Sequence, residues 1–202
     1  MQKVQIMKPS VGKGSLARWI GSALSRFRRD EKGLIATELA VVLPVFIFSI
    51  FGVYTLWDAY RMLNTSAKAA YTVSDLLSRE TRTVNDAYLT GLHNTMQYLV
   101  GDRLPVKTRF TSIIYSDARK RFEVQWSRSP FGKMPQLTTS SLQAYKDKIP
   151  NMADGDAIIL VESEAHFTPM MTEFLVEKNF EEFVVTRPRF VPKLCHADVY
   201  CG

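Results

Sequence analysis

Residue types and motifs used in catalysis are scarce in this sequence. Its 202 residues include three histidines and two cysteines. They contain no His-Glu-x-x-His metal motif, no Gly-x-Ser-x-Gly nucleophile motif and no glycine-rich phosphate loop. Because an enzyme needs several convergent chemical groups, these absences argue against catalysis by this chain. We therefore expect a protein that is not an enzyme and that uses no cofactor.

One stretch nevertheless holds a set of potential metal ligands. Glu162, Glu164 and His166 alternate along the chain, so on a β-strand they would lie on one face. Two interpretations are open: a divalent metal site, or the solvated face of a half-buried sheet. We favour the solvated face, because alternating polar residues are typical of a sheet with one side in water. No metal site is assigned.

Charged side chains are missing from one long segment. Between Leu39 and Trp57 there is no Asp, Glu, Lys or Arg. A helix of that length rises about 28 Å, close to the roughly 30 Å thickness of the hydrocarbon core of a bilayer. The run is longer than the core of a conventional secretory signal, and no small-residue cleavage site closely follows it. The segment predicts a transmembrane helix, which we place at residues 34–57.

Excess positive charge is confined to one end of this segment. Residues 1–33 contain eight lysines and arginines against two acidic residues, whereas the rest of the chain contains 18 of each. A nucleic-acid-binding protein usually carries basic residues through its folded part, so nucleic acid is not an expected partner. Basic residues beside a span instead mark its cytoplasmic side. The charge pattern therefore predicts a cytoplasmic N-terminus and an exported C-terminal part.

The basic leader contains an amphipathic pattern. Leu16, Trp19, Ile20, Leu24 and Phe27 recur at the spacing of one helical face, with arginines around them. A helix lying on the inner membrane surface fits this pattern. A short soluble helix and a disordered arm are the alternatives. We favour surface association, because the neighbouring span tethers the segment to the membrane.

A single carboxylate, Glu38, lies near the start of the apolar run. A charge inside the bilayer costs about 2.5–3.5 kcal/mol on insertion scales, so such residues are usually paired or functional. The alternative is that Glu38 reaches the headgroups and stabilises a helix N-terminus. Gly33, five residues earlier, is expected to end the preceding helix. Pro44 is expected to kink the apolar helix near Ala40.

A cut between Gly33 and Leu34 would explain this arrangement. The new α-amine of Leu34 would start the helix, and Glu38 lies four residues further along the same face. The carboxylate would then pair with this amine or with the amine of a neighbouring subunit. Glu38 and Gly33 would both gain a role that they lack in the uncut chain.

The sequence beyond the span predicts a folded domain. Helical periodicity continues to about Arg79, and Asn85 suits the N-cap of a second helix that ends at Gly101-Asp102. Further along the chain, a short helix is expected at Ser140–Lys148. Strand patterns occur at Val106–Tyr115, Arg121–Trp126, Ala157–Phe167 and Phe183–Phe190. Pro188 in the last of these indicates an edge strand or a strand end.

These patterns together predict an α+β fold class. A long N-terminal transmembrane helix would continue into an exported domain with a small, mainly antiparallel sheet. We divide the chain into a cytoplasmic basic leader (1–33), the transmembrane helix (34–57), its helical extension (58–80) and the exported α+β domain (81–202).

Both cysteines, Cys195 and Cys201, lie downstream of the span. The predicted topology places them outside the cytoplasm, where disulfides persist. Free thiols are one alternative. A metal site with His196 is another, although it offers only three ligands. We favour a disulfide between the two cysteines.

The residues around Gly33 resemble a known signal. The string Phe27-Arg28-Arg29-Asp30-Glu31-Lys32-Gly33, with Thr37-Glu38-Leu39-Ala40-Val41-Val42-Leu43-Pro44 after it, resembles the type III signal of type IV prepilins. It is similar to TadE/TadF-type proteins of the tight-adherence (Flp) pilus system. Arg187-Pro188-Arg189 is similar to members of that group as well. In the prepilin family a membrane aspartyl protease, the prepilin peptidase, cuts after the glycine on the cytoplasmic side.

The resemblance implies a pilin-like minor pseudopilin of the bacterial inner membrane with a periplasmic domain. Gly33 would precede the cut, Leu34 would be the new N-terminus and Glu38 the carboxylate at the fifth position after the cut. The implied partners are the prepilin peptidase, pilin and other pseudopilin subunits, and the pilus assembly platform. The alternatives are an uncut bitopic envelope scaffold or receptor and, third, a membrane-tethered enzyme.

Overall fold

The computed structural model describes residues 25–26, 32–101 and 104–201. The amphipathic helix expected in the leader lies outside these residues, apart from Ser25 and Arg26, which are helical. The chain forms two compact units, Met1–Ile50 and Phe51–Gly202, which are described separately.

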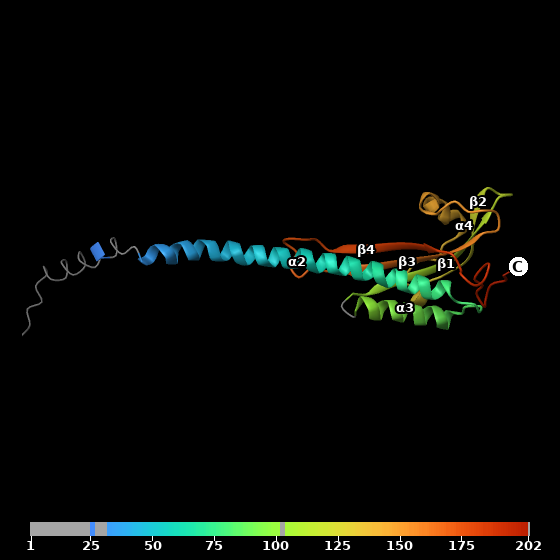
Figure 1. Ribbon diagram of the computed structural model, residues 1–202, viewed down its shortest axis with the longest axis horizontal. Helices are drawn as coiled ribbons and strands as arrows, with labels where there is room; N and C mark the ends of the chain where they lie inside the picture. The colour runs from blue at the N-terminus through green and yellow to red at the C-terminus, as the bar shows by residue number, and fades with distance from the viewer. Residues whose placement is uncertain (1–24, 27–31, 102–103, 202) are drawn as a thin grey trace, which may run out of the picture. The chain divides into compact units, whose positions relative to one another are not determined.

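One helix, α2, covers Lys32–Ser78 and is 47 residues long (Figure 1). The predicted continuation of the apolar helix to about Arg79 is confirmed. Gly33 does not precede this helix but lies in its first turn, where the first backbone N–H groups lack helical partners and a glycine therefore costs little. Pro44 lies inside α2, and the helix continues on both sides of it. The kink at Pro44 stays a prediction.

A second helix, α3, covers Asp86–Val100. Asn85 caps it as predicted: its side-chain oxygen accepts a hydrogen bond from the backbone N–H of Tyr88 at 2.8 Å. Gly101 ends the helix with a φ of 97°, a backbone conformation that favours glycine. Both predicted ends of this helix are confirmed.

Four strands form one antiparallel sheet in the order β2-β1-β3-β4. Their bounds are Val106–Ser116 for β1, Arg121–Arg128 for β2, Ala157–Phe167 for β3 and Lys178–Thr186 for β4. A short helix α4 (Thr139–Leu142) and a 3-10 helix η2 (Gln143–Lys148) occupy the stretch expected to hold a short helix. The long helix followed by this sheet confirms the α+β class.

The last strand begins and ends earlier in the chain than predicted. The prediction was Phe183–Phe190, but β4 begins at Lys178, which pairs with Phe167, and ends at Thr186. Pairing with β3 decides this start, because the local pattern around Asn179 contains no strong strand signal. β4 is an edge strand, and Pro188 lies just beyond its end, as proline cannot donate a ladder hydrogen bond.

The main core lies where α2 and α3 pack against the sheet. Ala70, Val73 and Leu77 of α2 are fully buried there, and Leu89 and Met96 of α3 are buried beside them. Burying one large apolar side chain stabilises a fold by about 1.5–3 kcal/mol. A smaller cluster under α4 and η2 covers the opposite face of the sheet, and its buried members are Ile113, Leu137, Leu142, Ile149, Ile158 and Leu160.

Candidate functional site

The N-terminal half of α2 exposes its apolar side chains. Ile35 and Val41 are both more than 70% exposed, and Val45 and Phe46 are at least 60% exposed. In the described part of the chain, α2 is the one helix long and apolar enough to cross a membrane. Contiguous exposed apolar surface of this extent marks a site that contacts lipid or another protein.

Glu38 lies on this exposed half of α2. The ion pairs between described side chains include none with Glu38. Leu34 and Glu38 are four residues apart in one helix, so they occupy the same face. Gly33 is exposed, and no atom lies within 4 Å of the place where a Cβ would stand. Gly33 itself is therefore not covered by any of the described residues.

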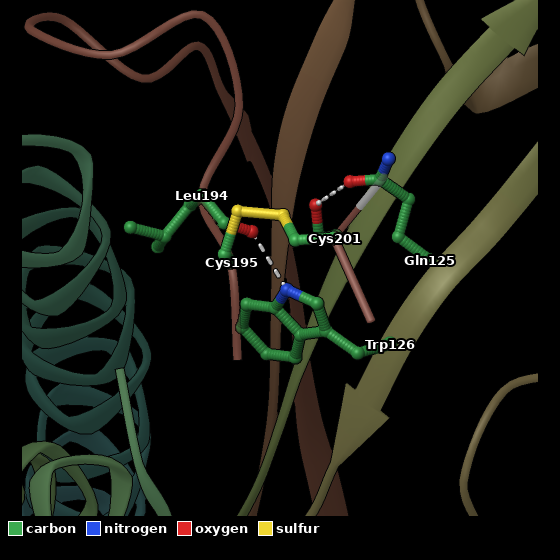
Figure 2. The surroundings of a disulfide bond; sticks show 6 residues. Gln125, Trp126, Leu194, Cys195 and Cys201 are labelled. Atoms are coloured by element: carbon green, nitrogen blue, oxygen red, sulfur yellow. Dashed lines mark hydrogen bonds between the residues drawn. A yellow bond between two sulfur atoms is a disulfide. The ribbon is translucent and has the colours of Figure 1, made fainter. Parts of the chain in front are cut away.

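Cys195 and Cys201 form a disulfide, with their Cα atoms 5.6 Å apart. Figure 2 shows it above the ring of Trp126 in β2, whose indole N–H donates to the carbonyl of Leu194 at 2.7 Å. The predicted pairing is confirmed. Because both sulfur atoms are used in this bond, the alternative metal site with His196 has lost two of its three ligands.

His196 instead bridges two acidic residues. Its Nε2 lies 3.2 Å from Oδ1 of Asp86, and its Nδ1 accepts from the backbone N–H of Asp198 at 3.2 Å. The imidazole is buried, whereas both carboxylates are exposed. These three residues form the group that could hold a metal ion within the described part of the chain. Both ring nitrogens already have hydrogen-bond partners, which accounts for the buried imidazole without a metal.

The C-terminal segment 187–201 fastens the two helices to the sheet. The backbone N–H of Arg189 donates to the carbonyl of Ser78 at 2.8 Å, and its guanidinium lies 2.6 Å from the carboxylate of Asp75. Val84 exchanges backbone hydrogen bonds with Cys195 and Ala197, at 2.9 and 2.8 Å. The segment therefore joins the end of α2 and the start of α3 to β2.

The expectation of a solvated face is wrong for Glu162. Its side chain is buried, and Arg109 of β1 donates to its two carboxylate oxygens from Nε at 2.7 Å and Nη2 at 2.6 Å. Arg109 also donates from Nη1 to the carbonyl of Pro135 at 2.6 Å. Burial alone would lower the pKa of Arg109, but hydrogen bonding to Glu162 and its charge raise this pKa above its ordinary value.

Glu164 and His166 share the face of Glu162, as predicted, but they have partners of their own. Lys107 lies 2.9 Å from Glu164, and Asn179 donates to the same carboxylate oxygen. Nδ1 of His166 lies 2.7 Å from Oδ1 of Asn179. Among the described residues, these side chains do not form a group that could hold a metal. The arrangement is a cross-strand polar network that joins β1, β3 and β4.

No family model matches this chain, and the searches of curated proteins and of solved structures likewise found no match. The feature that the folded domain does not account for is the uncovered half of α2 with its single carboxylate.

Proposed function

We propose that this chain is a minor pseudopilin: a subunit that is anchored in the bacterial inner membrane by α2 and supports the assembly of tight-adherence pili. The observation that carries the proposal is the placement of Glu38, four residues after Leu34 on the uncovered half of α2. A carboxylate in that position is expected to be paired or functional. A new amine at Leu34 supplies a partner.

The basic leader and the folded domain support the same proposal. The excess of positive charge in residues 1–33 orients the N-terminus towards the cytoplasm, which is where the prepilin peptidase cuts. The disulfide suits a domain that folds in the periplasm. The continuous helix from Lys32 to Ser78, packed on an antiparallel sheet over its second half, suits a pilin-like subunit. In this role the helix packs laterally against other subunits and the domain adds specificity.

The direct test is the N-terminus of the membrane form. The chain is expressed with and without an active prepilin peptidase, and the purified protein is examined by intact mass spectrometry. We expect loss of the first 33 residues when the peptidase is active, leaving Leu34 as the N-terminus. Substitution of Gly33 by a bulky residue, G33L, should block the cut. The matched control is Gly91→Leu, which changes an exposed glycine of α3 with no atom within 4 Å of its Cβ position.

An intact leader in cells with active peptidase would contradict processing. It would favour the alternative, an uncut bitopic scaffold or receptor for another exported factor. The two roles also differ at Glu38: Glu38→Ala should abolish piliation if the carboxylate pairs with a new amine, and should be harmless in an uncut scaffold. The enzyme alternative gains no support from Glu162, Glu164 and His166, whose polar groups bind their neighbours.

A further inference from the structure

The connection between β3 and β4 is longer than the fold requires. Neighbouring antiparallel strands can be joined by a two-residue turn. Here residues 168–177 join them, and this loop contains five large apolar residues: Met170, Met171, Phe174, Leu175 and Val176. Leu175 packs against the main core and so holds the loop in place. Reversing the chain between β3 and β4 therefore does not by itself explain the length and the apolar content of this loop.

The loop lies against the apolar part of α2. A Cβ atom at Gly52 would stand 3.2 Å from Cε1 of Phe174, so the phenyl ring rests directly on the helix backbone. Figure 1 shows the β3–β4 connection alongside α2. Gly52 lies five residues before Trp57, where the uncharged run ends. At 1.5 Å per residue, Phe174 therefore lies about 7 Å inside that end of the run.

Aromatic residues, and the first charged residues after the uncharged run, lie at this level of α2. Tyr54 and Trp57 are about half exposed, with their rings 6.0 Å apart. The guanidinium of Arg61 stands over the Trp57 ring, 5.6 Å from its centroid. Tyrosine, tryptophan and arginine in this order are typical of the boundary between hydrocarbon and headgroups. The loop is therefore at the depth of a membrane surface, if α2 is anchored as proposed.

The outer side of the loop is apolar and uncovered. Met170 and Val176 are 71% and 74% exposed. Apolar side chains of α2 are also exposed at the same level, namely Phe51, Val53, Tyr54, Leu56 and Trp57. Nearby charges are of both signs, with Glu173 and Glu177 in the loop and Lys178 after it. The surface therefore favours apolar contact over the binding of a particular charged headgroup.

We propose that loop 168–177 is a second membrane contact, which dips into the outer boundary of the bilayer beside α2. Met170, Phe174 and Val176 contact the upper acyl chains, and Glu173 stays among the headgroups. The loop then fixes the tilt and height of the domain above the membrane. This inference rests on the proposed anchoring by α2.

The test uses the full chain in phosphatidylcholine nanodiscs. Benzoylphenylalanine, which crosslinks to whatever its ring contacts, replaces Met170 in one variant and Val176 in a second, because both side chains are exposed. Phe190 is the matched control: it is exposed, and it follows Arg189, which binds the carbonyl of Ser78. Ser78 is about 39 Å along the helix from Gly52. Benzoylphenylalanine at Leu43 tests the anchor itself.

We expect phospholipid adducts at positions 43, 170 and 176, with a yield at 170 several-fold above that at 190. Adding anionic lipid or salt should leave that ratio unchanged. Adducts at 43 but at neither loop position would overturn the membrane contact and leave the anchor intact. Crosslinks from 170 to a second protein chain would also overturn it, in favour of a subunit contact. An absence of lipid adducts at all four positions would remove both the anchor and the loop contact.

Discussion

A carboxylate in the apolar half of α2 and one in the folded domain have opposite surroundings. Glu162 is buried, and a guanidinium binds both of its oxygens. Glu38 is exposed on a helix of exposed apolar side chains. The domain thus pairs its buried carboxylate internally and buries an apolar core, whereas the first half of α2 leaves both its carboxylate and its apolar side chains exposed. The first half of α2 therefore calls for a surrounding that the described residues do not supply, and under the proposed function a bilayer with an adjacent amine would supply it.

The largest expected effect comes from exchanging the two carboxylates for amides. Glu162→Gln leaves the buried Arg109 without its counter-charge and should lower the free energy of unfolding by about 3–5 kcal/mol. Glu38→Gln should leave that free energy unchanged, because Glu38 lies outside the folded domain. Denaturant unfolding of the full chain in detergent, followed by the circular dichroism of the domain, measures both. Similar losses for the two variants would contradict the comparison.

The next effect concerns apolar packing along α2. Leu77→Ala removes a fully buried side chain and should cost about 2–5 kcal/mol of stability. Leu43→Ala removes a leucine that is 47% exposed, and the unfolding transition of the domain should not move. The same denaturation experiment serves for both variants. If Leu43→Ala destabilised the domain as much as Leu77→Ala, the first half of α2 would belong to the folded core.

The smallest expected effect is the pH dependence of the domain. Burial, with a smaller contribution from the charge of Lys133, lowers the pKa of His93 below its ordinary value. The unfolded chain therefore binds a proton more readily, so stability should fall as the pH drops below about 6.5 and level off once folded His93 is also protonated. Thermal unfolding between pH 8 and pH 5 measures this loss.

His93→Gln is the matched variant for the pH experiment. A glutamine can still approach the hydroxyl of Thr108, which lies 2.9 Å from Nδ1 of His93. Its amide does not titrate, so the pH dependence between pH 8 and pH 5 should flatten while the unfolding temperature at high pH changes less. An unchanged slope would assign the pH dependence to another group.

Local sequence signals predicted most of the elements but not their partners. The apolar run, the cap at Asn85 and the strand Ala157–Phe167 depend on neighbouring residues, and the structure confirms all three. The start of β4 depends on pairing with β3, which the local sequence does not contain. The cleavage at Gly33 and the pairing of Glu38 stay predictions, because they depend on a peptidase and on other subunits.

The ion pair of Glu162 was missed for the same reason. Alternation correctly placed Glu162, Glu164 and His166 on one face, but that pattern does not reveal what covers the face. Arg109 lies opposite Glu162 only because β1 and β3 are adjacent in the sheet, although 53 positions separate the two residues in sequence. An arginine in the middle of the predicted strand Val106–Tyr115 was the available signal, since a guanidinium that becomes buried needs a carboxylate.

The C-terminal fastening of the domain has a consequence for its biogenesis. The segment 187–201 closes the fold by binding Ser78, Val84 and Trp126, which are all made much earlier. During synthesis α2 leaves the ribosome before this segment does. The domain can therefore complete its folding only after this segment has also left the ribosome.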